Sequence, residues 1–257
     1  MIIEKHEGNH YVIKLNRPEV RNAFNPEMIH KITETFNQLH HKKEIRAVII
    51  EGEGSVFSSG ADLGWMQSLV NSNVDVNQAD AEKLHGLFQA IWNCDVPVLT
   101  CVHGAAYGGA LGIMAVSDYV ICEDDAKLCF SEVKLGIAPA IVSEFLLKKC
   151  NPSHVSAWML SGVPFTAQEA QVSGLVHRVA TKGNVQSEKN NFMKHILDSG
   201  PEAVRALKKL LREIPHTRDR EVMMKTTNLI AYLRASQEGQ EGLKSFLEKR
   251  KPSWRHA

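Results

Sequence analysis

Short apolar segments alternate with segments of helical spacing along the first two thirds of the chain. Residues 11–15 (YVIKL) and 47–50 (AVII) are typical of strands. Between them, apolar residues recur at the spacing of a helix: Met28, Ile29, Ile32, Phe36 and Leu39. A third apolar segment, residues 98–102 (VLTCV), leads into a glycine-rich turn and an apolar helix. This alternation predicts an α/β fold with a mainly parallel sheet covered by helices.

The pattern changes after Ala180. Residues 181–184 (TKGN) mark a break, and from about Ser187 the spacing is helical throughout. We therefore expect a core over residues 1–195 and a helical region over residues 196–257. The apolar side of that region must be covered elsewhere, and it comprises Ala203, Leu207, Leu210, Leu211, Met223, Leu229, Tyr232 and Leu233.

Two glycine-rich turns follow two of the predicted strands. Residues 51–63 (EGEGSVFSSGADL) follow the strand at 47–50, and residues 103–112 (HGAAYGGALG) follow the strand at 98–102. Glycine permits positive φ, and a helix that begins at such a turn leaves its first N–H groups unpaired. If the strands are neighbours, the N–H groups of Ala61 and Gly109 converge on one carbonyl oxygen and form an oxyanion hole. Close packing of a helix on its sheet is the alternative explanation for one glycine cluster, and neither turn has the spacing of a nucleotide-binding loop.

A carboxylate follows the second turn in the chain. Glu132 lies in a loop after a second apolar segment, and it could be a surface group paired with Lys127 or Lys134. A proton-transfer group beside an oxyanion hole is, however, what the formation and protonation of an enolate require. The two features together indicate an enzyme that acts on an activated carbonyl group.

Composition and charge are those of a globular metabolic enzyme. The chain has 257 residues, of which 44% are hydrophobic and 23% charged, and its net charge of +1 gives no footprint for nucleic acid. No apolar segment approaches the ~20 residues of a membrane span. The N-terminus lacks a secretory signal, and the five cysteines form no C-x-x-C pair, so we expect a cytoplasmic protein with reduced core thiols and no metal site.

The histidines give no strong signal of chemistry. His40 and His41 lie at the polar end of a predicted helix, where solvation explains them. His103 precedes the second glycine turn, where it could be catalytic or could bond the backbone of the turn. Residues 71–77 (NSNVDVN) are polar and predict a surface loop between the first turn and the next helix.

Five motifs resemble those of one known family. They are NRPEVRNAF (16–24), FSSGADL (57–63), HGAAYGGA (103–110), FSEVKLGIAP (130–139) and EGLKSFLEKRKPSW (241–254). In this order and spacing they resemble the crotonase superfamily, the enoyl-CoA hydratases and isomerases. Residues 61–66 (ADLGWM) and 135–140 (LGIAPA) look most like the methylglutaconyl-CoA hydratase branch of leucine breakdown.

The resemblance implies a fold and an assembly. The fold is the crotonase (ClpP/crotonase-like) spiral of repeated ββα units with a C-terminal helical trimerisation region. The expected assembly is a homotrimer or a dimer of trimers. Coenzyme A enters as part of an acyl-CoA thioester substrate, and no separate cofactor is expected.

The resemblance also implies roles for individual residues. Catalysis is assigned to the N–H groups of Ala61 and Gly109 and to the carboxylate of Glu132. Coenzyme A contacts are assigned to Arg21, Ala23, Ala61, Asp62, Leu63 and Lys249, of which the terminal lysine would reach a neighbouring subunit's phosphate. The acyl pocket is assigned to Trp65, Met66, Tyr107, Pro139 and Ile141.

One position departs from the family pattern. Hydratases of this family carry a second glutamate three residues after the oxyanion glycine, and here that residue is Gly112. Glu144 is a possible substitute. With Glu132 alone, the enzyme could hydrate a 2-enoyl-CoA or could shift its double bond as an isomerase. An RNA-binding relative and a pseudoenzyme are the non-catalytic alternatives.

Overall fold

The computed structural model describes residues 1–39 and 42–255, so His40 and His41 lie outside the described residues. The main sheet has the order β1 (Ile2–Glu7), β2 (His10–Leu15), β3 (Ala47–Gly52), β4 (Val98–Val102), β6 (Tyr119–Glu123) and β8 (Arg178–Ala180). β1 pairs antiparallel with β2, and the pairs that follow are parallel. The predicted mainly parallel α/β fold is confirmed.

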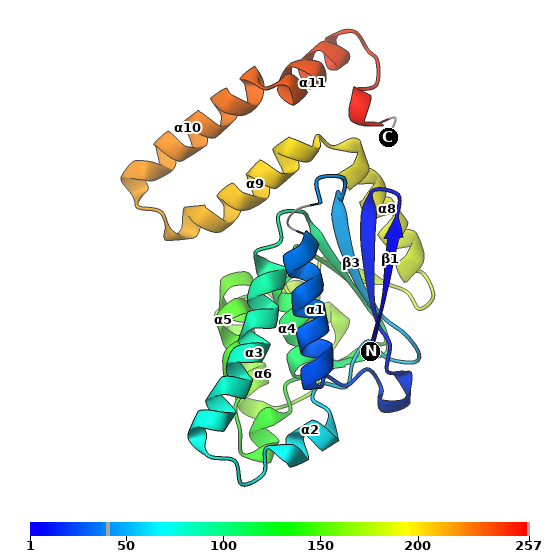
Figure 1. The fold of residues 1–257 in the computed structure, drawn as a ribbon, viewed down its shortest axis with the longest axis vertical. Helices are drawn as coiled ribbons and strands as arrows, with labels where there is room; N and C mark the ends of the chain where they lie inside the picture. The colour runs from blue at the N-terminus through cyan, green and yellow to red at the C-terminus, as the bar shows by residue number, and fades with distance from the viewer. Residues whose placement is uncertain (40–41, 256–257) are drawn as a thin grey trace.

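Helices cover both faces of this sheet (Figure 1). On one face lie α1 (Pro26–Leu39), α3 (Val74–Trp92), α4 (Gly109–Val116) and α5 (Ala140–Lys149), and on the other lies α8 (Val185–Asp198). Strand β4 is buried at every position, because side chains on both of its faces enter a core. This two-sided burial explains why the strand has an uninterrupted apolar sequence and no alternation with polar residues.

A second sheet pairs β5 (Ala105–Tyr107) with β7 (Lys127–Cys129) in parallel. Short helices complete the core: η1 (Pro18–Val20), α2 (Leu63–Ser68), η2 (Glu132–Leu135), α6 (Pro152–Ser161) and α7 (Ala167–Ser173). The five cysteines are buried and free, as expected for core thiols. Within the described residues, no helix is long and apolar enough to cross a membrane.

The polar segment 71–77 is only partly the loop that its composition predicted. The side chain of Asn73 accepts a hydrogen bond from the N–H of Val76 and caps α3, which begins at Val74. The second half of the segment is therefore the first turn of a helix. Asparagine is a strong helix-capping residue, and that local signal overrides the polar composition.

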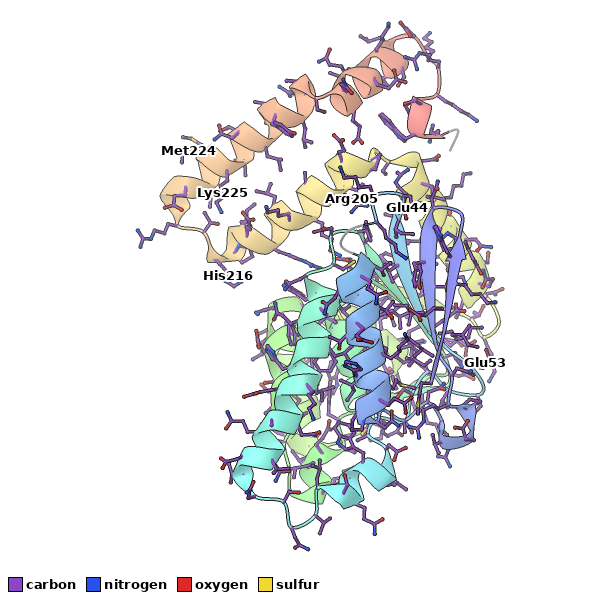
Figure 2. The ribbon with its side chains drawn as sticks, in the orientation of Figure 1. Glu44, Glu53, Arg205, His216, Met224 and Lys225 are labelled. Carbon is purple, nitrogen blue, oxygen red and sulfur yellow. The ribbon has the colours of Figure 1, made fainter. Side chains whose placement is uncertain are left out.

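The C-terminal helices extend away from the core as an arm (Figure 1). The arm comprises α9 (Pro201–Glu213), η3 (Ile214–His216), α10 (Asp219–Ala235), α11 (Gln237–Leu247) and η4 (Ser253–Arg255). Figure 2 shows Lys225 on the side of α10 nearer to α9, where its Nζ lies 2.9 Å from Glu213 Oε2. The boundary expected between residues 195 and 196 falls within α8, whose last residue is Asp198.

Apolar side chains of the arm are exposed in the single chain. Met223 of α10 is 72% exposed, and Phe246 of α11 is 81% exposed. Other exposed apolar side chains lie along the same two helices, and extended apolar surface of this kind marks association sites. The residues after α8 are mostly helical, as their spacing predicts, and part of their apolar side is exposed.

Candidate active site

The two glycine turns lie side by side at one end of the central strands. Strands β3 and β4 are neighbours, as the sequence argument required. Beyond the strands, the Ser58 N–H donates to the Ala105 carbonyl and the Tyr107 N–H donates to the Ser58 carbonyl, both at 3.1 Å. The first turn is thereby joined to strand β5, which leads directly into α4.

The two predicted oxyanion donors are free to bind a ligand. Ala61 is bridged to Phe24 through its neighbours, since the Phe24 N–H donates to Gly60 and the Asp62 N–H donates to Phe24. In such a parallel bridge the N–H of Ala61 itself points away from the partner strand. Gly109 is the first residue of α4, so its N–H has no acceptor within the helix. Among the hydrogen bonds of the described residues, neither N–H has an acceptor, and both residues line one cavity of about 420 Å³.

Gly108 gives the turn its shape. Its φ of 51° and ψ of −118° are accessible to glycine and not to residues with a side chain. A Cβ atom at this position would also lie 2.9 Å from Oε1 of Glu132. Glycine is thus required both by the backbone conformation and by the closeness of the carboxylate.

Glu132 lines the same cavity at the start of η2. Its side chain is half-buried, and its Oε2 atom has no hydrogen-bond partner in the described part of the chain. Burial raises the pKa of this carboxyl above its ordinary value of 4.5. A buried carboxylate oxygen without a partner at a cavity wall is free to exchange a proton with a ligand, which a surface group paired with Lys127 or Lys134 would not be.

The five residues assigned to an acyl pocket all line this cavity. Trp65 and Met66 come from α2, Tyr107 from β5, and Pro139 and Ile141 from the start of α5. Trp65 is held in place by its Nε1 atom, which donates to Asp80 Oδ1 at 3.2 Å. The structure adds apolar wall residues that the sequence analysis missed, namely Phe24, Leu84, Leu135, Ile137 and Val142. Leu84 carries no local signal of this role, because only the tertiary fold brings α3 to the site.

An adjoining cavity of about 520 Å³ brings together most of the predicted coenzyme A contacts. It is lined by Arg21, Ala23, Ala61, Asp62 and Leu63, and Ala61 and Leu63 also line the first cavity. The two cavities therefore meet at the turn that carries Ala61. Lys249 lies in the turn after α11 and lines neither cavity of its own chain.

Asp62 lines this second cavity and also stabilises the local structure. Its Oδ1 accepts hydrogen bonds from the N–H groups of Gly64 and Trp65 and so caps α2. Arg17 lies 2.8 Å from its Oδ2 and lowers the pKa of the carboxyl. Arg17 also donates to the Ala23 carbonyl, so it joins the segment after β2 to the turn that carries Ala61. The sequence analysis did not identify this role of Arg17.

The position of the missing second glutamate is filled by an aromatic ring. A Cβ atom on Gly112 would lie 2.3 Å from Cζ of Phe88, a fully buried side chain of α3. Phe88 packs edge-on against Phe145, with ring centroids 5.9 Å apart. Gly112 is therefore a packing requirement in this chain, and α4 presents no carboxylate to the cavity.

Two other candidates are excluded from the site by their contacts. Glu144 does not line the cavity; it is exposed and pairs with Lys148 at 2.6 Å and with His85 at 3.1 Å. It is therefore no substitute acid. The Nε2 atom of His103 lies 3.0 Å from the Gly54 carbonyl, the backbone contact considered as the alternative to catalysis.

A mainly parallel sheet with paired glycine turns, free N–H groups and a half-buried carboxylate in one cavity defines a crotonase-type enzyme. The chain belongs to the enoyl-CoA hydratase/isomerase family, whose model matches residues 5–257. It is 29% identical to the carnitinyl-CoA dehydratase of Escherichia coli over 96% of this chain and 95% of the relative. It is 28% identical to the mitochondrial enoyl-CoA hydratase domain-containing protein 3 of Xenopus laevis, over 100% of this chain and 86% of the relative. A crystal structure of an enoyl-CoA hydratase from Shewanella pealeana superposes with a TM-score of 0.93 at 31% identity, covering 98% of this chain and 95% of that one.

Adding a methyl group at Gly112 should destabilise the protein, because the ring of Phe88 occupies the space. We expect Gly112→Ala to lower the free energy of unfolding by about 1–3 kcal/mol, the usual cost of overpacking a core. Gly86→Ala is the matched control on α3, where an added Cβ would meet no atom within 4 Å. It should raise stability by about 0.5–1 kcal/mol through helix propensity. Denaturant unfolding of both variants measures the difference, and equal stabilities would contradict the packing argument.

Proposed function

We propose that this protein is an enoyl-CoA hydratase that adds water to the double bond of a 2-enoyl-CoA thioester. The observation that carries the proposal is the unpartnered Oε2 of Glu132 in the cavity that also holds the N–H groups of Ala61 and Gly109. The relatives include proteins named as hydratases and a dehydratase, which supports chemistry in which water is added to or removed from a CoA thioester. The similarity of residues 61–66 and 135–140 to the methylglutaconyl-CoA hydratase branch makes that thioester the first acyl group to test.

In the proposed mechanism the thioester oxygen accepts hydrogen bonds from Ala61 and Gly109. Glu132 binds a water molecule and takes one of its protons as the water oxygen forms a bond to C3. The electrons of the double bond pass to the thioester oxygen as an enolate, which the two donors stabilise. Glu132 then returns the proton to C2, so the net change is the addition of one water and the carboxylate is regenerated.

Isomerisation is the second candidate, and one observation favours it. Phe88 closes the space that a second water-holding carboxylate would need. A single carboxylate suffices to move a proton from one carbon of an enoyl thioester to another, with the same oxyanion hole stabilising the enolate. The two reactions differ only in whether water reaches the cavity beside Glu132.

We further propose that the adjoining cavity binds the coenzyme A portion of the substrate and that the arm mediates assembly. Arg21 is the cation that lines this cavity, and its left-handed backbone conformation, with φ of 53°, fixes the bend of the first loop. The assembly is a trimer or a dimer of trimers. Within it, Lys249 would contact the phosphates bound by a neighbouring chain.

A panel of 2-enoyl-CoA and 3-enoyl-CoA thioesters in ¹⁸O-labelled water tests the function. We expect the labelled oxygen to appear in a 3-hydroxyacyl product. Interconversion of 2-enoyl and 3-enoyl thioesters without label would overturn the hydratase proposal in favour of the isomerase. No reaction with any thioester would support the pseudoenzyme alternative.

Replacing Glu132 with glutamine should abolish turnover, because an amide keeps the shape but carries no proton. We expect a loss of at least 10²-fold in kcat, the lower end of the range of about 10²–10⁴ for a general acid–base group. Since the folded-state pKa lies above 4.5, the folded chain holds this proton more tightly than the unfolded chain. Burial of the charged carboxylate therefore costs stability at neutral pH, and that cost disappears as the pH falls below about 4.5. Glu132→Gln should accordingly be at least as stable as the wild type at pH 7, and a clear loss of stability there would contradict the assignment.

Gly109→Pro tests the oxyanion donor, because proline removes an N–H and is tolerated at the first position of a helix. We expect kcat to fall by about 10²–10³-fold, the usual effect of losing one oxyanion donor. Gly109→Ala is the control: it places the same Cβ 3.3 Å from the ring of Phe24 but keeps the N–H. A proline variant as active as the alanine variant would show that this N–H does not stabilise the oxyanion.

The open apolar surface of the arm predicts a stable oligomer. Light scattering of the purified protein should give a mass of three or six times 28.7 kDa. Phe246→Asp should lower this mass, because a charge would be buried where the exposed ring is expected to pack. The control is Lys244→Asp on the same helix, where the side chain is polar. A stable wild-type monomer would contradict the proposed assembly.

A further inference from the structure

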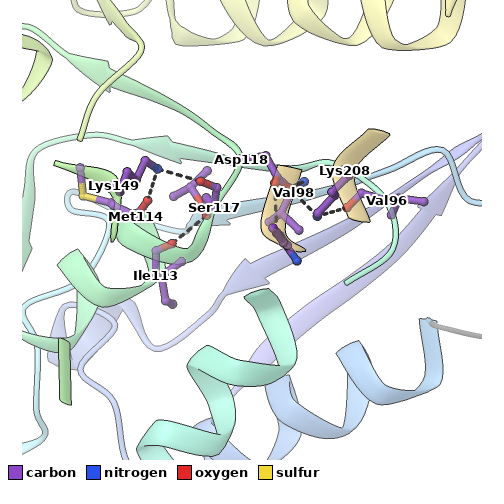
Figure 3. A network of polar contacts seen from close by, with 10 residues as sticks. Val96, Val98, Ile113, Met114, Ser117, Asp118, Lys149 and Lys208 are labelled. Carbon is purple, nitrogen blue, oxygen red and sulfur yellow. Dashed lines mark hydrogen bonds and ion pairs between the residues drawn. The ribbon is translucent and has the colours of Figure 1, made fainter. Parts of the chain in front are cut away.

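Lys149 is a largely buried cation outside the proposed reaction. It is the last residue of α5, and its Nζ donates to the carbonyls of Met114 and Ser117, both at 2.7 Å (Figure 3). Met114 belongs to the last turn of α4, and Ser117 is its C-cap. Lys149 therefore ties the C-terminal ends of α4 and α5 together.

The other ends of the same two helices form the candidate active site. Gly109 begins α4 and Ala140 begins α5, and both residues line the cavity that contains Glu132. The two helices thus run in the same direction, with their N-terminal ends at the thioester site and their C-terminal ends at Lys149. Aligned peptide dipoles make the N-terminal ends positive, which favours negative charge on the thioester oxygen.

α4 has no cation of its own at its C-terminal end, and it has no acidic residue in its first turn. The ammonium group of Lys149 supplies that charge from the neighbouring helix. At about 1.5 Å per residue, the eight residues of α4 separate Lys149 from the oxyanion donor by about 12 Å. A fixed positive charge at the C-terminal end of α4 offsets the negative end of the helix dipole. It thereby helps to hold the N-terminal end, with Gly109, in place.

We infer that Lys149 is a positioning residue for the oxyanion hole, acting through α4 and α5 on Gly109 and the start of the acyl pocket. The inference rests on the proposed function for its kinetic readout. It makes no claim that Lys149 contacts the substrate.

Burying the charged form of Lys149 costs free energy, as is expected of a cation that has a functional role. Desolvation lowers the pKa of Lys149 from 10.5 to about 8. The folded chain therefore binds this proton less tightly than the unfolded chain, so stability rises as the pH increases from about 8 to 10.5. The charge is held at a cost near neutral pH, which offsets part of the stabilisation from its two hydrogen bonds.

Other charged and titratable groups share the cavity beside Lys149. Desolvation and the nearby Lys149 lower the pKa of His177 to about 4, so His177 is neutral near pH 8. Burial raises the pKa of Cys150 to about 11. Asp118 is held by Lys208 and Arg212 of α9, at 2.5 and 3.1 Å. The titratable and charged groups that line the same cavity as Lys149 are His177, Asp118, Lys148, Lys208, Arg212 and His216.

The test compares Lys149→Met with Lys149→Arg and with Lys148→Met. We expect Lys149→Met to lower kcat by about 5- to 30-fold, as for a buried charge at a helix end, with little change in the affinity for coenzyme A. Lys149→Arg should restore most of the rate. Lys148→Met is the matched control, because Lys148 is the adjacent residue and pairs at the surface with Glu144. The kcat of each variant is measured well below its own melting temperature, so that every variant is compared in its folded state.

The pH profile and hydrogen exchange complete the test. Wild-type kcat should fall as the pH rises through about 8, while that of Lys149→Arg should not. Amides of α4 should exchange faster in Lys149→Met than in Lys148→Met, a measurement that needs no turnover. If the wild type transforms no thioester, the proposed function fails, and exchange alone decides the role of Lys149. Unchanged kcat and exchange in Lys149→Met, or a loss of kcat that Lys149→Arg shares in full, would overturn the inference.

Discussion

The pairing of the first glycine turn with β5 is the constraint on which the rest of the site depends. Two hydrogen bonds of 3.1 Å, between Ser58 and the backbone of residues 105 and 107, align two segments that are 47 to 49 residues apart in sequence. This pairing brings the N–H of Ala61 and the N–H of Gly109 to one cavity. Because both donors are backbone groups, their positions are set by the fold and not by side-chain rotamers. The proposed oxyanion hole would therefore be preorganised, which is what makes such donors effective in catalysis.

Two charged groups, one in the site and one at the far end of α4, are buried at a cost in free energy. Oε2 of Glu132 is buried without a partner, and Lys149 is buried against two carbonyls. Burial shifts each pKa towards the neutral form. They lie at opposite ends of α4, one beside the oxyanion donor and one at the C-cap. Groups of this kind are a cost to stability, and they are expected where chemistry needs them.

Much of this arrangement could be predicted from the sequence, and the exceptions have physical causes. The strands, the glycine turns and the two backbone donors follow from local patterns, since glycine and uninterrupted apolar segments have strong conformational meaning. The start of α3 within residues 71–77 is set by a single N-cap residue, Asn73, which the polar composition of the segment does not reveal. The filling of the site beside Gly112 by Phe88 could not be predicted, because it joins two helices through tertiary packing. The ion pair between Arg17 and Asp62 could not be predicted for the same reason.

At the position of the family's second glutamate this chain has Gly112, which packs against the ring of Phe88. The absence of that carboxylate changes the acid–base properties of the site. A second glutamate would hold water and would also repel the charge on Glu132, which would raise the pKa of both groups further. Here Phe88 packs against Gly112, α4 carries no carboxylate, and desolvation is what raises the pKa of Glu132. In the proposed mechanism Glu132 therefore both takes and returns the proton. Access of water to its free oxygen is then what would separate hydration from isomerisation, and the residues around that oxygen are mostly apolar, among them Trp65 and Ile141.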